Sequence, residues 1–186
     1  MVQIKLTGSG GQGIIVAGEI LAYAAVLAGK EGSARSSYGS AARGGITTAE
    51  VIIAKNFIPA PFVEKPDYII ALSQSGYDFL VKQYQVIQPT FIIDSSTIKP
   101  NSVITNQLNI PATAIAEQEL KSTLGANMIM LGFFAGYTEM IKKEFFVDAI
   151  KQQISEKYLT INLKAFEIGF EQGAKTKSST NVSKFD

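Results

Sequence analysis

Gly8-Ser9-Gly10-Gly11-Gln12-Gly13 is the stretch that decides the fold class, because it joins two segments of different pattern. Residues 2–7 alternate between apolar and polar side chains, which predicts a β-strand. Residues 14–27 are rich in alanine, with Glu19 as their only charged residue, which predicts a helix that is buried over most of its surface. A glycine-rich turn between a strand and a helix indicates an α/β domain.

Short strands and helices alternate through the rest of the chain. Further strands are predicted at residues 46–54, 68–72, 90–93 and 103–105. Further helices are predicted at residues 74–83, 111–121, 127–142, 144–157 and 159–173. This order predicts a single domain over residues 1–175, with a mainly parallel sheet flanked by helices that are concentrated toward the C-terminus. The polar segment 176–186 is expected to be a tail, with fraying from Lys175 onward.

The glycine turn matches the pattern G-x-G-x-x-G between a strand and a helix, which is the setting of a dinucleotide-binding, Rossmann-like fold. Glycines let the backbone approach an anion, and free N–H groups at the start of the helix can bind it. The complete fingerprint needs an acidic residue at the end of a second strand. Glu31 has nearly the right spacing, but Ala28-Gly29-Lys30 before it does not form an apolar strand.

Three interpretations of this turn stay open: a contact with an anion or a partner, a dinucleotide site, or a tight turn that binds nothing. The candidate residues of the turn are Gly8, Gly10, Gly11, Gln12 and Gly13.

A second constellation lies in residues 32–45, which are rich in serine and glycine and are predicted to form a loop. Both arginines of the chain fall in this segment. Arginine suits carboxylate and phosphate recognition because its guanidinium group binds these anions through two hydrogen bonds. The candidate residues here are Arg35, Tyr38, Gly39, Arg43, Gly44 and Gly45. In a parallel sheet, both glycine-rich segments are expected at one edge, beyond the carboxyl ends of the strands.

Composition excludes several classes of site. The chain has no cysteine and no histidine, so it offers no thiolate for an iron–sulfur cluster and no Cys/His set for zinc. Nucleophilic sites that depend on histidine are excluded for the same reason. We therefore predict neither a catalytic residue nor a metal site in this chain.

Charged residues make up 18% of the sequence, below the roughly 25% of an average soluble domain, which indicates a large core or a surface partly covered by partner subunits.

Charge and hydropathy also limit the partners. The net charge is +1 and the lysines are spread along the chain, so no nucleic-acid partner is expected. Residues 122–138 carry no charge, but they are fewer than the roughly 20 residues of a membrane span and predict a buried core helix instead of membrane insertion. The N-terminus lacks the layout of a signal peptide, and a cytoplasmic location is expected.

Taken together, the two motifs resemble the gamma subunit of 2-oxoacid:ferredoxin or 2-oxoacid:acceptor oxidoreductases, most of all the 2-oxoglutarate type. The matching pieces are Gly10-Gly11-Gln12-Gly13, Tyr38-Gly39, Arg43-Gly44-Gly45 and the segment Pro66-Asp67-Tyr68-Ile69-Ile70-Ala71-Leu72. The resemblance covers about residues 2–175. It departs from the family pattern at Ser40-Ala41-Ala42, where many relatives have a proline and a glutamate.

The resemblance implies a complex that decarboxylates a 2-oxoacid, transfers the acyl group to coenzyme A and passes electrons to ferredoxin or a similar acceptor. It implies alpha and beta partner subunits, and a delta subunit in some complexes. Thiamine diphosphate, Mg²⁺ and iron–sulfur clusters are expected on those chains, with no cofactor on this one. Our own hypothesis is that Arg43 lies near the acyl-acceptor or substrate path and positions anionic groups there. The alternatives are a pyruvate or branched-chain oxoacid complex, a stand-alone dinucleotide-binding protein, and a small anion-binding scaffold.

Overall fold

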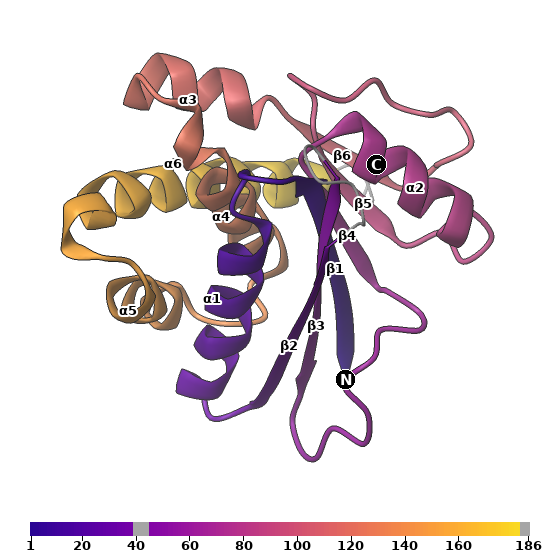
Figure 1. Cartoon of the computed structure of the whole chain (residues 1–186), viewed down its shortest axis with the longest axis horizontal. Helices are drawn as coiled ribbons and strands as arrows, with labels where there is room; N and C mark the ends of the chain where they lie inside the picture. The colour runs from indigo at the N-terminus through magenta and orange to yellow at the C-terminus, as the bar shows by residue number, and fades with distance from the viewer. Residues whose placement is uncertain (39–44, 183–186) are drawn as a thin grey trace.

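The structure, a computed structural model, describes residues 1–38 and 45–182. It forms a six-stranded sheet in the order β2-β3-β1-β4-β5-β6 (Figure 1). The strands are β1 (Val2–Ser9), β2 (Glu31–Tyr38), β3 (Ile46–Ala54), β4 (Tyr68–Ala71), β5 (Thr90–Asp94) and β6 (Gln107–Ile110). The helices are α1 (Ile14–Leu27), α2 (Gln74–Tyr84), α3 (Ala112–Leu120), α4 (Ala126–Thr138), α5 (Lys143–Gln153) and α6 (Glu156–Val182), with a short 3₁₀-helix, η1 (Thr123–Gly125), before α4.

The strand directions confirm the predicted α/β class and the mainly parallel sheet. β1, β4, β5 and β6 run parallel, whereas β3 runs antiparallel to β1 and β2 runs antiparallel to β3. These two reversals bring the end of β2 to the edge where β1 ends, since Tyr38 faces Thr47 and Ser9 faces Ile46. The described ends of both glycine-rich segments therefore lie at one edge of the sheet, as the sequence predicted.

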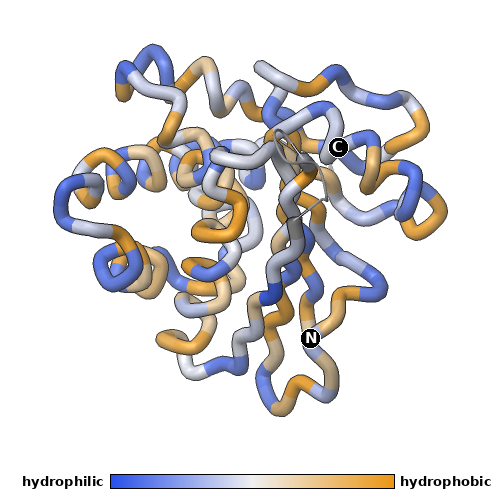
Figure 2. Tube along the Cα trace, viewed as in Figure 1, coloured by the Kyte–Doolittle hydropathy of each residue, from blue (hydrophilic) through white to orange (hydrophobic). Residues whose placement is uncertain are grey.

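Helices cover the two faces of the sheet unequally. α2 lies on one face, and α1, α4, α5 and α6 lie on the other (Figure 1). Ile4 and Leu6 of β1 belong to the larger core beneath these four helices, while Ile69 and Ala71 of β4 belong to the smaller core beneath α2. Figure 2 shows hydrophobic residues along the strands and on the helix segments beside them. α1 and α2 thus leave the adjacent strands β1 and β4 toward opposite faces, and such a switch point is where open α/β sheets form ligand crevices.

One loop prediction and one strand prediction need correction. Residues 32–45 were predicted to be a loop, but Glu31–Tyr38 is the edge strand β2. Its serines and glycine carry little β propensity, and the ladder to β3 along the whole strand supplies what the local sequence lacks. The strand predicted at residues 103–105 is also wrong, because β6 is Gln107–Ile110. Ile104 instead lies in a turn, donating its backbone N–H to the Asn101 carbonyl, with its side chain buried in the smaller core.

The C-terminal helices differ from prediction mainly at their ends. α4 ends at Thr138 instead of running on to residue 142, because Glu139, the residue that follows it, has a left-handed backbone (φ 50°). The fraying predicted from Lys175 is also wrong, because α6 stays helical to Val182. An ion pair between Lys177 and Glu139 ties the last part of α6 to the end of α4, a contact that the local sequence cannot reveal. Among the described residues, no helix is long and apolar enough to cross a membrane.

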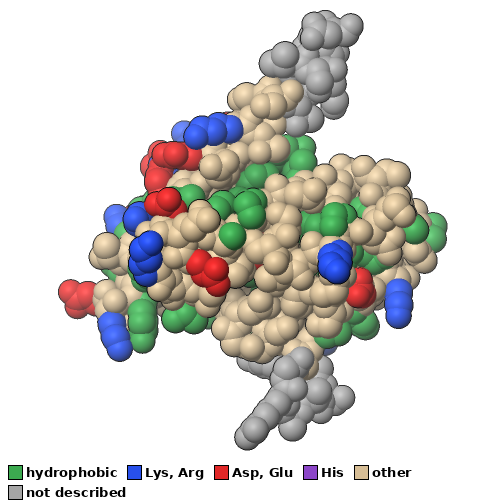
Figure 3. Space-filling view, turned by 90° about the horizontal axis from the view of Figure 1, so that it is seen from above, with side chains coloured by type: hydrophobic (Ala, Val, Ile, Leu, Met, Phe, Trp, Pro, Cys, Tyr) green, Lys and Arg blue, Asp and Glu red, His purple; other side chains and the backbone are tan. Residues whose placement is uncertain are grey.

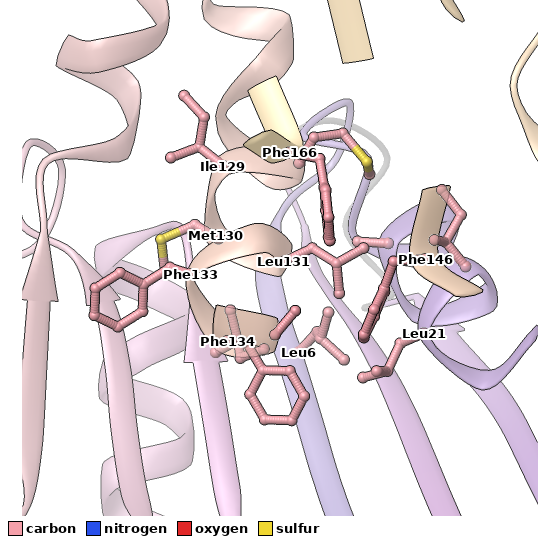
Figure 4. Close-up of a cluster of buried hydrophobic side chains, with 14 of the residues drawn as sticks. Leu6, Leu21, Ile129, Met130, Leu131, Phe133, Phe134, Phe146 and Phe166 are labelled. Carbon is pink, nitrogen blue, oxygen red and sulfur yellow. The ribbon is translucent and has the colours of Figure 1, made fainter. Parts of the chain in front are cut away.

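α4 and α6 are in direct backbone contact through glycines. Four glycines line this contact: Gly132 and Gly136 of α4, and Gly169 and Gly173 of α6. A Cβ atom added to any of them would lie 2.0–2.2 Å from a carbonyl oxygen of the other helix. Apolar side chains of α4 fill the space around the contact, and Figure 4 shows Phe134 beside Leu6 of the sheet. Residues 126–138 of the uncharged segment therefore form a core helix, as predicted, whereas its start forms η1, where Leu124 is exposed.

A row of charged residues crosses the antiparallel part of the sheet. The register places Lys5 opposite Glu50 and Glu50 opposite Arg35. The Lys5 Nζ lies 2.7 Å from the Glu50 Oε1, and an Arg35 guanidinium nitrogen lies 3.7 Å from the Glu50 Oε2. Lys5 is almost fully buried, with its ammonium group over the Tyr84 ring, and Arg35 lies over the Phe62 ring. These contacts place the half-exposed Arg35 side chain beside Glu50 and Phe62.

Stability is expected to fall at alkaline pH. Burial lowers the pKa of Lys5, but its interactions with Glu50 and Tyr84 outweigh this and raise the pKa above 10.5. Burial raises the pKa of Tyr68 and Tyr77 above 10.0. A group whose pKa is raised on folding stabilises the protein below its unfolded pKa and loses that contribution as pH rises through the folded value. Urea unfolding at a series of pH values from neutral upward should show a constant free energy of unfolding up to about pH 10 and a decline above it.

The variant Lys5→Met separates the two causes of this decline. It removes the lysine contribution and keeps that of the two tyrosines, so its decline should be shallower than in the wild-type protein. An equal decline in both proteins would show that the Lys5–Glu50 pair does not contribute.

Candidate functional site

The glycine turn connects the end of β1 to the start of α1. The Gln12 backbone N–H donates to the Ser9 carbonyl at 3.2 Å, which closes the turn. Gly11 and Gly13 have φ angles of 89° and 70°, in the left-handed region that side chains rarely adopt. These two glycines are therefore required by the backbone path itself.

Gln12 holds the turn in place. Its Oε1 accepts a hydrogen bond from the Ser9 backbone N–H at 2.6 Å, and its Nε2 donates to the Leu72 carbonyl at 3.0 Å. Leu72 follows β4 directly, so the carboxamide joins the ends of the two adjacent strands at the switch point. Gln12 was a candidate ligand contact in the sequence, and in the structure both of its polar atoms bind backbone.

Asn127 supports the turn from α4. Its Nδ2 donates to the Gly13 carbonyl at 3.1 Å, and its Oδ1 accepts from the Met128 N–H at 2.9 Å. Sequence reasoning missed this residue, because nothing in its neighbourhood connects it to a turn 114 positions earlier in the chain. It is largely buried, at 7% exposed.

A cavity lies on each side of the turn. One has a volume of about 390 Å³, and we call it the threonine cavity; besides the turn it is lined by Leu72, Thr97, Thr113, Thr123, Leu124 and Asn127. The other has a volume of about 280 Å³, and we call it the helix-end cavity; it is lined by residues of the turn together with Ile14, Ile15, Val16 and Thr47. Both open at the carboxyl edge of the sheet, where the surface seen in Figure 3 is largely uncharged in its middle, with most charged side chains toward its margins.

The helix-end cavity has the chemistry of an anion site. Ile14, Ile15 and Val16 form the first turn of α1, whose backbone N–H groups have no acceptor within the helix. No side chain caps this end, because Gly13 occupies the cap position. The uncapped N–H groups and the helix dipole favour a negative group there.

The structure brings some of the predicted site residues together and separates others. The residues from Gly10 to Gly13 form the turn, Gly8 lies in the last part of β1, and the Tyr38 backbone and Gly45 lie at the same edge. Gly39, Arg43 and Gly44 lie outside the described residues. Arg35 lies in the middle of β2, before Tyr38. It contacts Glu50 and Phe62 and lines neither of the two cavities.

The dinucleotide fingerprint is incomplete in space as well as in sequence. Glu31 begins β2 and pairs with Ala54, so it lies at the edge opposite the glycine turn. β3 also separates β2 from β1 in the sheet. Glu31 is thus in no position to bind the ribose of a nucleotide whose phosphates contact the turn.

Comparison with known proteins places the chain in a family. Residues 3–172 match the family model described as pyruvate ferredoxin/flavodoxin oxidoreductase. The 2-oxoglutarate synthase subunit KorC of Methanocaldococcus jannaschii is 39% identical over 91% of this chain and 92% of the relative. The ketoisovalerate oxidoreductase subunit VorA of Methanothermobacter thermautotrophicus is 33% identical, with 36% of its length covered, and the pyruvate synthase subunit PorC of Methanothermobacter marburgensis is 30% identical, with 97% covered.

Solved structures agree with this placement. The gamma subunit of a keto/oxoacid ferredoxin oxidoreductase from Geobacter sulfurreducens superposes with a TM-score of 0.76 at 28% identity, covering 94% of this chain and 99% of that chain. The 2-oxoglutarate:ferredoxin oxidoreductase of Magnetococcus marinus shares the fold over 94% of this chain and 31% of its own, with a TM-score of 0.82 at 23% identity. The resemblance to the gamma subunit of 2-oxoacid oxidoreductases is thereby confirmed. The chain belongs to the pyruvate ferredoxin/flavodoxin oxidoreductase family.

Proposed function

We propose that this chain is the gamma subunit of a cytoplasmic 2-oxoglutarate:ferredoxin oxidoreductase. The complex converts 2-oxoglutarate and coenzyme A to succinyl-CoA and CO₂ while it reduces ferredoxin or a similar acceptor. Alpha and beta subunits, and a delta subunit where the complex has one, are its partners. Thiamine diphosphate, Mg²⁺ and the iron–sulfur clusters are assigned to those partners. For the clusters the reason is that this chain has no cysteine to bind one.

The similarity to KorC supports 2-oxoglutarate as the oxoacid. KorC matches in length as well as in sequence, with 92% of the relative covered at 39% identity. The branched-chain relative VorA matches over 36% of its length, and the pyruvate relative PorC matches in length at 30% identity. The covered length favours the 2-oxoglutarate type over the branched-chain type, and the identity favours it over the pyruvate type, which is the second candidate.

The glycine turn supports a role beside the path of coenzyme A. The uncapped start of α1 suits a phosphate group, and the Magnetococcus marinus enzyme, whose fold matches here, was solved with coenzyme A bound. Arg43 is the second candidate contact, because arginine binds phosphate and carboxylate groups through two hydrogen bonds. The chain then contributes binding groups to the complex, and the redox chemistry takes place on other subunits.

An affinity purification of the tagged chain from its native cells tests this proposal. Coenzyme A-dependent oxidation of 2-oxoglutarate, measured with a dye acceptor, should co-purify with two or three other chains, thiamine diphosphate and iron. Faster oxidation of pyruvate would replace the substrate assignment and keep the complex. A chain that purifies alone and without activity would contradict the proposal.

Arg43→Ala in the assembled complex tests the role of that side chain. The Michaelis constant for coenzyme A or for the oxoacid should rise by roughly tenfold, as expected for the loss of one charge-assisted hydrogen bond. Arg35→Ala is the matched control, because Arg35 is held by Glu50 and Phe62, and it should leave both Michaelis constants unchanged. Unchanged kinetics in Arg43→Ala would assign Arg43 a structural role only.

A further inference from the structure

β2 is an edge strand, and no strand of the described residues pairs with its outer side. The sheet order places it at one end, next to β3 alone, and Figure 1 shows it at the outer side of the sheet. In an antiparallel ladder, alternate residues direct their backbone N–H and C=O groups to opposite sides of the strand. About half of the backbone groups of β2 therefore point away from β3 and offer hydrogen bonds to a further strand.

This strand lacks several of the features that protect exposed sheet edges. Its eight residues keep an unbroken register with β3, from Glu31 opposite Ala54 to Tyr38 opposite Thr47, so no bulge interrupts it. It contains neither proline nor lysine, which natural edge strands use against pairing with other chains. The strand at the other end of the sheet, β6, has only four residues and is protected by its shortness. β2 is thus the long edge at which a partner strand can add.

The charges of β2 indicate which strand fits it. Lys5, Glu50 and Arg35 form a row of alternating charge across three strands, and Arg35 is the last member at the edge. The Arg35 side chain is 51% exposed and lies 3.7 Å from Glu50, which is too long for a hydrogen bond. Its guanidinium N–H groups thus stay available to an acceptor beyond the edge. β2 itself carries such an acceptor, because Glu31 lies on the same face of the strand, four residues earlier.

A second copy of β2 can pair with the first across a two-fold axis perpendicular to the sheet. Such an axis passes through one residue, because it keeps every side chain on its own face and facing residues share a face. With the axis at Ser33, Glu31 of each copy faces Arg35 of the other, and opposite charges at facing positions favour this register. An axis at Arg35 would instead place two arginines opposite each other, which is unfavourable.

An exposed apolar side chain lies near this axis on the α1 face of the sheet. Val26 of α1 is 49% exposed, and a Cβ atom added to Gly32 would lie 3.3 Å from its Cγ2. Gly32 is the neighbour of Ser33 in the strand, so a two-fold axis at Ser33 brings a second Val26 to the same face. Strand pairing would then cover apolar surface as well as backbone groups.

From these features we propose that β2 pairs antiparallel with β2 of a second copy of this chain, about a two-fold axis at Ser33. The pairing joins two sheets into one and continues the row Lys5, Glu50, Arg35 with Glu31 of the other copy. Because the axis reverses the strand direction, the glycine turns of the two copies lie at opposite edges of the joined sheet, each accessible to its own partners. The inference goes beyond the proposed function, since it uses only the edge strand and its charges.

Cysteine cross-linking of the full chain tests the pairing and its register, because the chain has no cysteine of its own. In Ser33→Cys the two thiols face each other across the axis, where facing Cα atoms lie about 4.5–5.5 Å apart, within the range of a disulfide. Mild oxidation should therefore convert this variant to a covalent dimer. Ser37→Cys is the matched control on the same face of the same strand. In this register its two copies lie about 27 Å apart, at roughly 3.4 Å per residue, so it should stay monomeric.

Sedimentation velocity over a concentration series measures the dimer without a cross-link. The paired segment, residues 31–35 of each copy, is a small interface, so the wild-type chain should show a monomer–dimer equilibrium that dissociates on dilution. Glu31→Lys should raise the dissociation constant about tenfold, because both facing pairs change from attraction to repulsion. Glu117→Lys is the matched control, since it makes the same charge change at an exposed position of α3, and it should dimerise like the wild type.

Three results would overturn the inference. One is a chain that stays monomeric at all concentrations and forms no disulfide in Ser33→Cys. Another is a disulfide in Ser37→Cys in place of Ser33→Cys, and the third is an unchanged dissociation constant in Glu31→Lys. If the isolated chain is monomeric and the Ser33→Cys thiol is protected from alkylation in the assembled complex, the edge pairs with another subunit instead. Because the first two experiments need no assembled complex, they can fail while the subunit assignment holds.

Discussion

Gly169→Ala is expected to lower the free energy of unfolding by about 2 kcal/mol. The added Cβ would lie 2.0 Å from the Ile129 carbonyl oxygen and 2.9 Å from the Phe133 nitrogen, both backbone atoms of α4. Backbone atoms cannot rotate away as a side chain can, so the two helices must separate. Overpacking of this kind costs up to about 3 kcal/mol, and the better helix propensity of alanine offsets roughly 1 kcal/mol.

A second substitution in the same contact should add less than its individual cost. Gly132 faces the Phe166 carbonyl oxygen, and its Cβ would lie 2.1 Å from that oxygen. Once Gly169→Ala has moved the helices apart, part of the space for a methyl group at position 132 already exists. The double variant should therefore be more stable than the sum of the two single effects predicts.

Urea unfolding of the single and double variants measures these effects. Thr160→Ala is the matched control, because it places alanine on the exposed side of α6 and should change stability by no more than about 0.5 kcal/mol. A Gly169→Ala protein as stable as the wild type would contradict direct backbone contact between α4 and α6.

The parts of the fold that the sequence predicted are those with a local signal. β1, the glycine turn and α1 follow from alternation, glycines and an alanine-rich run, and each is present where it was predicted. β2 has no such signal, because a serine-rich edge strand is specified by its pairing with β3. The persistence of α6 to Val182 likewise depends on its glycine contacts with α4 and on the Lys177–Glu139 pair.

The candidate site divides in the same way. The glycine turn could be predicted because its residues are contiguous and left-handed backbone at Gly11 and Gly13 requires glycine. The role of Gln12 as a tie to Leu72 and that of Asn127 as a tie to Gly13 could not, since both contacts join segments far apart in the chain. The same holds for the wall of the threonine cavity, where the Thr97 hydroxyl donates to the Leu72 carbonyl, 25 positions earlier in the chain.

Alanine substitutions along the turn should differ strongly, with Gly13→Ala the most damaging. The Gly13 φ of 70° strains any side chain, which costs about 1–2 kcal/mol. The new Cβ would also lie 2.3 Å from the Asn127 Nδ2, so it would displace the carboxamide that binds the Gly13 carbonyl. The loss of that hydrogen bond in a largely buried position adds about 1 kcal/mol, for a total of roughly 3 kcal/mol in urea unfolding.

Gly11→Ala and Gly10→Ala separate strain from contact. Gly11 has a φ of 89° but no atom within 4 Å of an added Cβ, so only the strain of about 1–2 kcal/mol is expected. Gly10 has neither a positive φ nor a neighbour within that distance, and Gly10→Ala should leave stability unchanged within about 0.5 kcal/mol. The order of stability should therefore be Gly10→Ala, then Gly11→Ala, then Gly13→Ala.

The Gly10 variant also decides whether the turn contacts a ligand. Gly10 lines the helix-end cavity, so a methyl group there would stand where a phosphate approaches the N–H groups of α1. In the assembled complex, Gly10→Ala should raise the Michaelis constant for coenzyme A several-fold while its stability stays that of the wild type. A rise without destabilisation cannot come from a turn that serves only to connect β1 to α1, because such a turn would tolerate a methyl group in open space. An unchanged Michaelis constant would reduce the glycine turn to that connecting role.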